Sequence, residues 1–288
     1  MSLSTVSTRT DDPAATGLER FGDGTVWADA EYRRVLGDWG AMSVDAIMGS
    51  CRGRCLRKLD DRENWFLPTP GGLAEGLYLK KHHARKKGPR IHIGPPERET
   101  PAFVEAQNIG RLTAAGIGTM RLVAYGQGIS GRRRGESFVL TEALDGYEPL
   151  DDFVEARFPN GIGEDRNDFY RLIDAVSDLA RRFHAAGFNH RDFYCCHFFV
   201  KEEGGRFEIR LIDLQRMQYR RSRRRRWIVK DLAQLAYSAP SAAVDCKAKV
   251  RFLKGYFGVR KLGPARKRLA KAVFAKQRYM EWKLGKGG

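Results

Sequence analysis

The sequence lacks a long apolar segment and a secretory signal. No stretch approaches the roughly 18 consecutive apolar residues that a transmembrane helix needs. Residues 1–20 contain neither the basic start nor the apolar stretch of a signal peptide, so we expect a disordered leader there. With 42% hydrophobic and 30% charged residues over 288 positions, the composition is typical of a soluble globular protein, and we expect a cytoplasmic location.

Cysteine is scarce and irregularly placed. The five cysteines are Cys51, Cys55, Cys195, Cys196 and Cys246. No two of them have the two-residue gap of a zinc knuckle, and an odd number without regular spacing is a poor disulfide framework. We therefore expect free thiols and no structural zinc.

Acidic residues are few in the C-terminal part. Residues 201–288 contain 25 Lys and Arg against 7 Asp and Glu, whereas residues 1–200 contain 27 against 28. The basic excess concentrates in residues 216–227 and 259–283. Such a surface attracts nucleic acid, anionic lipid or phosphorylated glycans, although it can also be a solvated face that only keeps the protein soluble.

Strand patterns fill the first half of the chain. Residues 47–59 and 76–82 predict a hairpin whose strands are separated by a turn-rich segment. Residues 120–126 and 137–144 predict two more strands.

Helical spacing predicts one helix in this half, at residues 103–116, and a long amphipathic helix at residues 168–187. We therefore expect an α+β fold with a strand-rich first half, a junction near residues 142–148 and a helix-rich second half. The apolar stripe of the long helix consists of Phe169, Leu172, Ile173, Val176, Leu179, Ala180 and Phe183.

Four polar residues fall, in chain order, where phosphoryl transfer would need them. This reaction depends on positioned cations and on one group that receives the proton of the acceptor hydroxyl. Lys80 lies in a predicted strand and Glu105 on the helix after it, so that a Lys held by a Glu can neutralise phosphate oxygens. Asp192 follows the long helix as the candidate proton acceptor. Asp213, in the apolar stretch 209–214, can bind magnesium through its carboxylate.

Each residue also has a simpler interpretation. Lys80 can be one of several exposed basic residues, Glu105 an ordinary solvent-facing residue, and Asp192 a turn cap. Asp213 is harder to explain in this way, because a carboxylate buried in an apolar strand needs a partner. The combination, rather than any single residue, favours a kinase.

Several contiguous motifs resemble the lipopolysaccharide core heptose kinases, the WaaP group of the bacterial lipopolysaccharide and Kdo kinases. The likeness spans roughly residues 44–260. Its motifs are LYLKKH (77–82), EAQNIGRLTAAGIGTM (105–120), VAYG (123–126), SFVLTEAL (137–144), HRDFYCCHFFV (190–200), LIDLQRMQYR (211–220), RRWIVKDLAQLAYS (225–238) and RFLKGYF (251–257).

The resemblance implies a two-lobed protein-kinase-like fold. It implies a small β-rich N-lobe with one helix at residues 21–144, which binds ATP, and a larger helical C-lobe at residues 145–288. It also implies transfer of the γ-phosphate of ATP to an inner-core heptose hydroxyl.

Site residues follow from the same resemblance. It makes Asp192 the proton acceptor, within the catalytic triplet that His190 and Arg191 begin. It makes Lys80 the phosphate-binding lysine, Glu105 its ion-pair partner and Asp213 the magnesium ligand. Residues 141–144, with Glu142 and Leu144, are the expected adenine-binding hinge. Lys230 and Asp231 are expected to brace the catalytic loop.

Two departures from the protein-kinase pattern bear on the ATP site. No G-x-G-x-x-G is present, and GSCRG, with Gly49 and Gly53, is the nearest candidate for a phosphate-covering loop. His197 stands where protein kinases carry a metal-binding Asn. Since imidazole suits transition metals better than magnesium, we expect Mg²⁺ dependence that tolerates Mn²⁺, with His197 on the metal or hydrogen-bonded near Asp192.

The implied acceptor accounts for the basic C-terminal part. A lipopolysaccharide precursor carries phosphate and carboxylate groups at the cytoplasmic face of the inner membrane, so we expect peripheral binding to that anionic surface. Three alternatives stay open: a Kdo kinase or a protein kinase of the same superfamily, and a catalytically inert scaffold that binds polyanions. No nucleic-acid motif is recognisable, and we expect no nucleic-acid partner.

Overall fold

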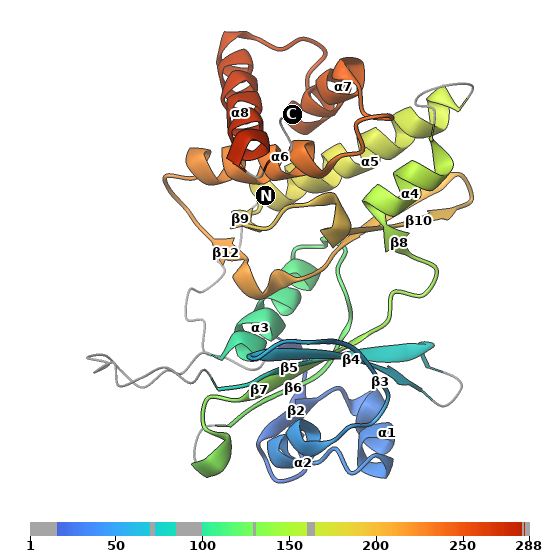
Figure 1. Cartoon of the computed structure of the whole chain (residues 1–288), viewed down its shortest axis with the longest axis vertical. Coiled ribbons are helices and arrows are strands. Elements are labelled where there is room, and N and C mark those ends of the chain that lie inside the picture. Colours follow the sequence, from blue (N-terminus) through green and yellow to red (C-terminus); the bar gives the residue numbers. More distant parts are fainter. Residues whose placement is uncertain are drawn as a thin grey trace, which may run out of the picture. The chain divides into compact units, whose positions relative to one another are not determined.

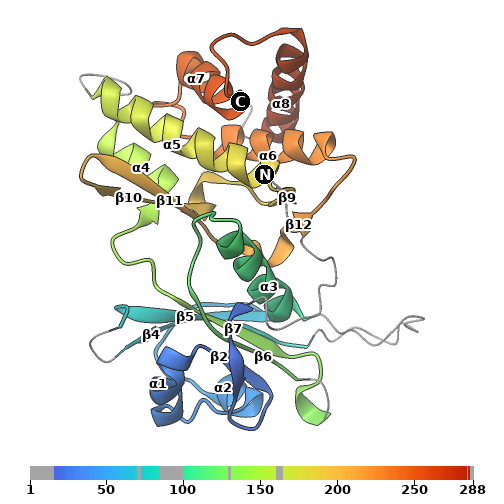
Figure 2. The same ribbon diagram turned by 180° about the vertical axis from the view of Figure 1, so that it is seen from behind.

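The computed structural model describes residues 16–69, 73–84, 100–128, 131–159, 165–283 and 285. The chain divides into two compact units, shown in Figures 1 and 2. The first unit comprises residues 1–111 and 121–143, and the second comprises residues 112–120 and 144–288.

One antiparallel sheet organises the first unit. Within the described ranges it has seven strands in the order β1-β2-β6-β7-β5-β4-β3. The strands are β1 (Glu19–Phe21), β2 (Val26–Ala28), β3 (Arg54–Lys58), β4 (Arg62–Pro68), β5 (Gly76–His82), β6 (Leu122–Gln127) and β7 (Ser137–Glu142).

Helices lie on both faces of this sheet. One face is covered by α1 (Arg33–Asp38) and α2 (Val44–Gly49), and α3 (Pro101–Ala114) lies on the other (Figure 1). Short 3-10 helices, η2 (Ala30–Tyr32) and η3 (Gly131–Arg133), complete the unit.

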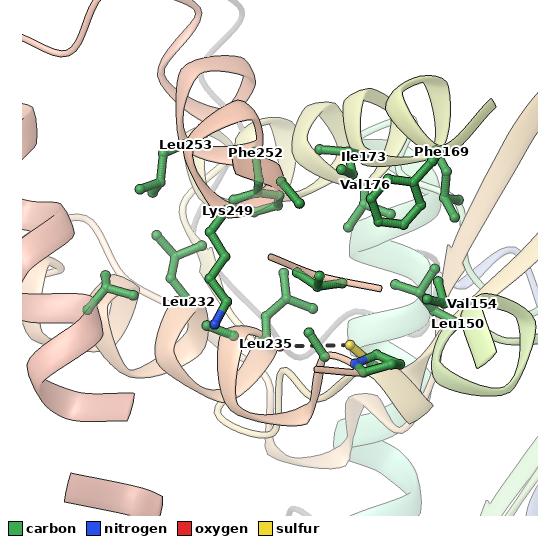
Figure 3. Close-up of a pocket in the computed structure, with 18 of the residues that line it drawn as sticks. Leu150, Val154, Phe169, Ile173, Val176, Leu232, Leu235, Lys249, Phe252 and Leu253 are labelled. Carbon is green, nitrogen blue, oxygen red and sulfur yellow. Dashed lines mark hydrogen bonds between the residues drawn. The ribbon is translucent and has the colours of Figure 1, made fainter. Parts of the chain in front are cut away.

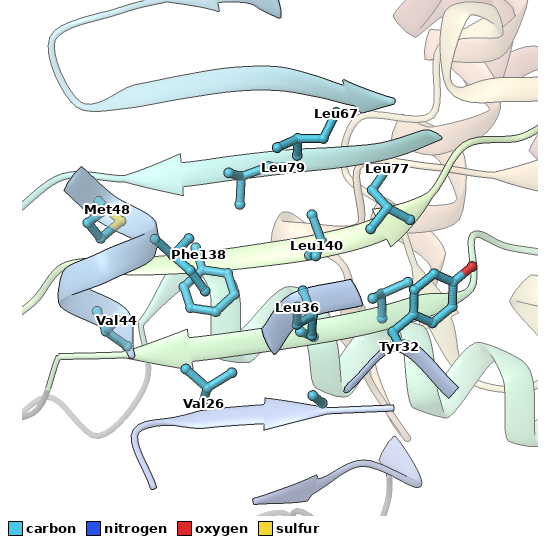
Figure 4. Close-up of a cluster of buried hydrophobic side chains, with 14 residues drawn as sticks. Val26, Tyr32, Leu36, Val44, Met48, Leu67, Leu77, Leu79, Phe138 and Leu140 are labelled. Carbon is cyan, nitrogen blue, oxygen red and sulfur yellow. The ribbon is translucent and has the colours of Figure 1, made fainter. Parts of the chain in front are cut away.

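The hydrophobic core of the first unit lies between the sheet and α1 and α2. Figure 4 shows apolar side chains from the strands pointing toward those two helices. The buried cluster is Val26, Ala28, Tyr32, Leu36, Val44, Ile47, Met48, Leu67, Leu77, Leu79, Val123, Ala124, Phe138 and Leu140.

Three local expectations for this half were wrong. Residues 47–49 end α2 instead of starting a strand, because Ser43 caps the helix by accepting a hydrogen bond from the amide of Ala46. The segment expected to be a turn contains β4, whose pairing with β3 and β5 overrides its turn-rich composition. With α1 and α2 present, the described first unit holds more than the single predicted helix.

The leader predicted at residues 1–20 was also placed too far along the chain, because its last residues belong to a strand. Residues 1–15 lie outside the described residues, but Glu19 and Arg20 belong to β1, which pairs with β2. The hydrogen bonds of this pairing come from another segment, so the local sequence does not reveal the strand.

The second unit is rich in helices, which together with the strand-rich first unit confirms the predicted α+β order. Its helices are α4 (Leu150–Arg157), α5 (Arg166–Ala185), α6 (Arg225–Ser238), α7 (Cys246–Phe257) and α8 (Pro264–Lys283). Its shorter elements are β8 (Glu148–Pro149), β9 (Phe188–Asn189), η4 (Cys195–His197), β10 (Phe198–Glu203), β11 (Arg206–Leu211), η5 (Leu214–Arg216) and β12 (Gln218–Tyr219).

The amphipathic helix α5 is central to this unit. Every residue of its predicted apolar stripe is buried, which confirms that stripe. Helix α7 packs closely on α5 at Gly255, where an added Cβ would lie 2.2 Å from Oγ of Ser177. Only glycine allows the two helices to approach in this way.

An apolar cavity of about 100 Å³ lies among α4, α5, α6, α7 and α8 (Figure 3). Its lining includes Cys195, three residues after Asp192, and Lys249 is the only charged residue in the described lining. A cavity with such a wall suits apolar packing rather than phosphoryl transfer.

In the described ranges, no helix combines the length and the apolar character that crossing a bilayer requires.

Candidate active site

The first unit brings Lys80 and Glu105 together. Nζ of Lys80 on β5 donates a hydrogen bond of 2.7 Å to Oε1 of Glu105 on α3. Glu105 is fully buried, and among the described residues its Oε2 has no hydrogen-bond partner. A buried carboxylate needs a cation close by, so this pair holds the lysine in a defined position.

Neighbouring Lys81 has a different environment because side chains alternate across a strand. Leu77, Leu79 and Lys81 face α1 and α2, whereas Lys80 faces α3. Nζ of Lys81 donates hydrogen bonds to the carbonyl oxygens of Met48 and Ser50. Burial lowers the pKa of this buried ammonium.

Glu142 at the predicted hinge is engaged within its own unit. Its Oε1 accepts hydrogen bonds of 2.6 Å from Tyr32 Oη and 3.1 Å from Arg121 Nη1. The amide of Glu142 donates to the carbonyl of Arg121. Leu144 begins the second segment of the second unit. An adenine-binding role for residues 141–144 would therefore depend on their backbone N–H and C=O groups, and this role stays a prediction.

Gly49 and Gly53 lie before the first strand of the β3–β4 hairpin. Gly49 is the last residue of α2. Gly53 has a φ of +85°, and an added Cβ would lie 2.2 Å from the carbonyl oxygen of Phe66, so close packing on β4 accounts for this glycine. The hairpin turns at residues 59–61, and a phosphate-covering role for Gly49 and Gly53 stays a prediction.

The candidate catalytic loop, residues 190–192, is held by Asp231 on α6. Oδ2 of this buried carboxylate accepts a hydrogen bond of 2.9 Å from the amide of His190, and Oδ1 accepts one of 3.0 Å from the amide of Arg191. Lys230, the preceding residue, donates through Nζ to the carbonyl of Arg191. Arg191 has a φ of +75°, a conformation that is costly for a residue other than glycine. These contacts stabilise it immediately before Asp192.

Asp192 has a partner that the sequence did not single out. Nη1 of Arg216 in η5 lies 2.9 Å from Oδ1 of Asp192. The side chain of Arg216 is 49% exposed and that of Asp192 is 17% exposed. The sequence does contain a signal for this partner, because Arg216 lies in the motif LIDLQRMQYR, three residues after Asp213.

His190 and His197 link the loop to the segment after β11. Nε2 of the buried His190 donates to the carbonyl of Ile212, and burial together with the charge of His197 lowers the pKa of His190 to about 4. Nδ1 of His197 donates to the carbonyl of Asp192 at 2.7 Å. Burial lowers the pKa of His197, but hydrogen bonds with Cys196 and with the Asp192 carbonyl and the charge of Asp213 raise it to about 9.

Asp213 differs from its predicted setting. It lies beyond β11, which ends at Leu211, and its backbone is left-handed with a φ of +56°. The carboxylate is partly exposed rather than buried in a strand, and its Oδ2 lies 3.7 Å from Nε2 of His197.

The donor set near Asp213 fits a divalent cation in part. No group of three or more His, Cys, Asp or Glu that could hold a metal occurs within the residues described. Asp213 nevertheless supplies a hard carboxylate of the kind that magnesium prefers, with the His197 ring beside it. A cation that also binds substrate phosphates needs only one or two carboxylates from the protein.

The cysteines agree with the expectation of free thiols. Cys51, Cys55, Cys196 and Cys246 are exposed and Cys195 is buried, and all five are unpaired.

Comparison with known sequences gives one family and several curated relatives. The lipopolysaccharide kinase (Kdo/WaaP) family matches residues 76–256, from β5 to α7. A lipopolysaccharide core heptose(I) kinase WaaP of Pseudomonas aeruginosa is 37% identical over 230 residues, which cover 76% of this chain and 82% of that protein. The same-named protein of Escherichia coli K12 is 36% identical over 234 residues, or 77% of this chain and 84% of that protein.

Comparison with solved structures finds a similar chain described as WaaP in complex with acyl carrier protein. It superposes with a TM-score of 0.67 at 29% sequence identity, over 90% of this chain and 98% of that chain. The predicted kinase-like α+β fold is thereby confirmed.

Proposed function

Because the chain belongs to the lipopolysaccharide kinase (Kdo/WaaP) family, we propose that it transfers the γ-phosphate of ATP to a heptose hydroxyl of the lipopolysaccharide inner core. Membership of this family makes the chain a phosphotransferase, with ATP as donor and a lipopolysaccharide as acceptor. The curated relatives, both named for heptose(I), support heptose as the sugar that is phosphorylated.

The observation that carries this proposal is the backbone support of the loop that ends in Asp192. Asp231 accepts the amides of His190 and Arg191, and Lys230 donates to the carbonyl of Arg191. Together these contacts hold the Asp192 carboxylate at a partly exposed position. A general base needs such a fixed position within reach of its proton.

Each proposed residue has one task. Lys80, aimed by Glu105, neutralises phosphate oxygens of ATP. Asp192 receives the proton of the acceptor hydroxyl as the hydroxyl oxygen bonds to the γ-phosphorus and ADP leaves. Asp213 and His197 would hold a divalent cation, Mg²⁺ or Mn²⁺, which when bound neutralises charge on the phosphates.

The test is ADP release from Mg·ATP with an unphosphorylated, heptose-containing core as acceptor. We expect Asp192→Ala to lower kcat by about 10²- to 10⁴-fold, the usual contribution of general base catalysis. The matched control is Asp152→Ala, which removes an exposed carboxylate in the first turn of α4 and is expected to retain activity.

Two results would contradict parts of this proposal. Equal activity of the Asp192 and Asp152 variants would remove Asp192 as the base. ATP binding by the wild type without phosphorylation of the heptose core would make heptose the wrong acceptor, and Kdo-containing and protein acceptors would be tested next.

We also propose that the basic part of the second unit attaches the protein to the anionic cytoplasmic face of the inner membrane, where the acceptor is assembled. Support comes from the charge of residues 201–288 and from the exposed basic residues of α8. Because a solved relative was found with acyl carrier protein, such a carrier is a second partner that we propose for this chain.

A further inference from the structure

The candidate base, Asp192, is already hydrogen-bonded to a side chain of its own unit. Asp192 Oδ1 accepts from Arg216 Nη1 at 2.9 Å, so one of the two oxygens that can receive a hydroxyl proton is already used. A base that must take a proton from an acceptor has to exchange this contact.

The ion pair between Arg216 and Asp192 can be exchanged for another partner at a low cost in free energy. Half of the Arg216 side chain is exposed, at 49%, and η5, which carries it, is a single 3-10 turn. Exposed ion pairs contribute little to stability, because solvent screens them and long side chains lose entropy when they are held. Another anion can therefore compete for the guanidinium.

The surroundings of Asp192 contain more positive than negative charge. The ammonium of Lys230 and the guanidinium of Arg191 accompany Arg216, whereas the carboxylate of Asp231 is bound to backbone amides. Burial lowers the pKa of Lys230, and the negative charge of Asp192 opposes this shift.

The positive charge continues from the loop into α6. The guanidiniums of Arg191, Arg220 and Arg226 lie 5.4, 4.8 and 4.5 Å from the ring centre of Trp227. Helix α6 has no acidic residue in its first turn, so its positive end adds to the same charge. A surface of this kind is complementary to an anionic acceptor.

We propose that Arg216 is a specificity residue that releases Asp192 only when an anionic acceptor binds. Without acceptor, Arg216 stays paired with Asp192. An acceptor carboxylate or phosphate near the reactive hydroxyl takes over the guanidinium, for which planar, two-oxygen anions are the preferred partners. This proposal rests on the proposed kinase function and adds the acceptor class, a sugar with a nearby anionic group.

The chemical step then proceeds with the base free. The acceptor oxygen forms a bond to the γ-phosphorus while the bond from that phosphorus to the bridging oxygen of ADP breaks. The hydroxyl proton passes to Asp192, and ADP departs with the electron pair of the broken bond. Arg216 remains on the acceptor anion throughout.

The experiment compares Arg216→Gln, Arg216→Lys and the wild type in two assays. The first measures kcat/KM for a heptose-bearing core and for the same core with its carboxylates reduced and its phosphates removed. The second measures ATP hydrolysis without acceptor, in which water takes the place of the hydroxyl. Arg181→Gln is the matched control, because this residue is 47% exposed and ion-paired with Asp178 on α5.

We expect the wild type and Arg181→Gln to prefer the anionic core by roughly 10- to 100-fold, the value of a charge-assisted hydrogen bond. Arg216→Gln should lose this preference through a higher KM, and its acceptor-free hydrolysis should rise about 3- to 5-fold because Asp192 is released. Arg216→Lys should keep part of the preference.

Two outcomes would overturn the inference. In one, Arg216→Gln behaves like Arg181→Gln in both assays. In the other, Arg216→Gln loses hydrolysis and transfer together, which would make Arg216 a support for Asp192. If the wild type phosphorylates no core at all, the proposed acceptor fails, whereas the hydrolysis assay still tests the ion pair between Arg216 and Asp192.

Discussion

At the scale of single residues, His197 connects the candidate base with the candidate metal ligand. Its Nδ1 donates to the carbonyl of Asp192, and its Nε2 lies 3.7 Å from Oδ2 of Asp213. One ring therefore touches both groups. Burial lowers the pKa of this ring, but its hydrogen bonds and the charge of Asp213 raise it to about 9, so the ring has to lose a proton before Nε2 can serve as a metal ligand.

The prediction at this scale concerns metal preference. We expect the wild type to work with Mn²⁺ as well as Mg²⁺, because imidazole binds transition metals more readily than magnesium. His197→Asn, which introduces the residue of protein kinases, should shift the ratio of Mg²⁺ to Mn²⁺ activity toward Mg²⁺ by about 10-fold. Titration of activity with each metal measures this ratio. If the enzyme works only with Mg²⁺ and His197→Asn does not change its activity, His197 is not a metal ligand.

At the scale of elements, a buried chain of hydrogen bonds joins α5, α6 and α7 next to the candidate catalytic loop. Burial lowers the pKa of His184, which favours the neutral ring with one N–H. Nε2 lies 3.3 Å from Oδ2 of Asp231, which can only accept, so Nε2 donates and Nδ1 accepts from Tyr256 Oη at 2.9 Å. Tyr256 thus fixes the ring that supports Asp231.

Tyr256→Phe tests this chain of contacts. The change leaves Nδ1 of His184 buried without its donor, which should lower the free energy of unfolding by about 1 to 3 kcal/mol. We expect kcat to fall while the KM for ATP stays close to the wild-type value, because the loop rather than the first unit is loosened. Urea unfolding and steady-state kinetics measure the two effects. Tyr279→Phe, at an exposed position on α8, is the control and should change neither.

At the scale of the whole molecule, the net charge of +17 arises from residues 201–288. Helix α8 buries Ala270, Val273 and Met280 and exposes basic side chains, together with Trp282, which is 75% exposed. An exposed Trp beside basic residues is suited to a membrane interface.

We predict binding to vesicles that contain anionic lipid, and loss of this binding as salt is raised. Changing Arg266, Lys267 and Arg268 to Ala should weaken it by about 100-fold, at about 1 kcal/mol for each charge near the surface. Co-sedimentation measures the affinity.

The control for this experiment removes equal charge from the first unit, through Arg20, Arg34 and Arg134, which are also exposed. Absence of vesicle binding at low salt would contradict the membrane proposal. Acyl carrier protein is then added as a competitor. If it displaces the protein from vesicles, the carrier and the membrane bind the same surface of the protein. If it does not, they bind different surfaces.

Local patterns predicted the elements with strong periodicity and missed the short ones. The stripe of α5 was predicted because its 3.6-residue period lies within one segment. By contrast, β4 contains Asn64 and Pro68, which favour turns, and it becomes a strand only through pairing on both sides. Helix α2 has only six residues, too few for a clear period.

The sequence by itself determined the order of a strand-rich half and a helix-rich half and the identity of the motifs, from LYLKKH to RFLKGYF, because contiguous residues carry both kinds of signal. Only the tertiary structure decided which distant side chains meet. The pairs Arg216 with Asp192, Asp231 with Arg191 and Tyr256 with His184 are 24, 40 and 72 residues apart. The periodicity of hydrophobic residues within one segment does not predict such contacts. They form only when the hydrophobic burial of α5, α6 and α7 brings those segments together.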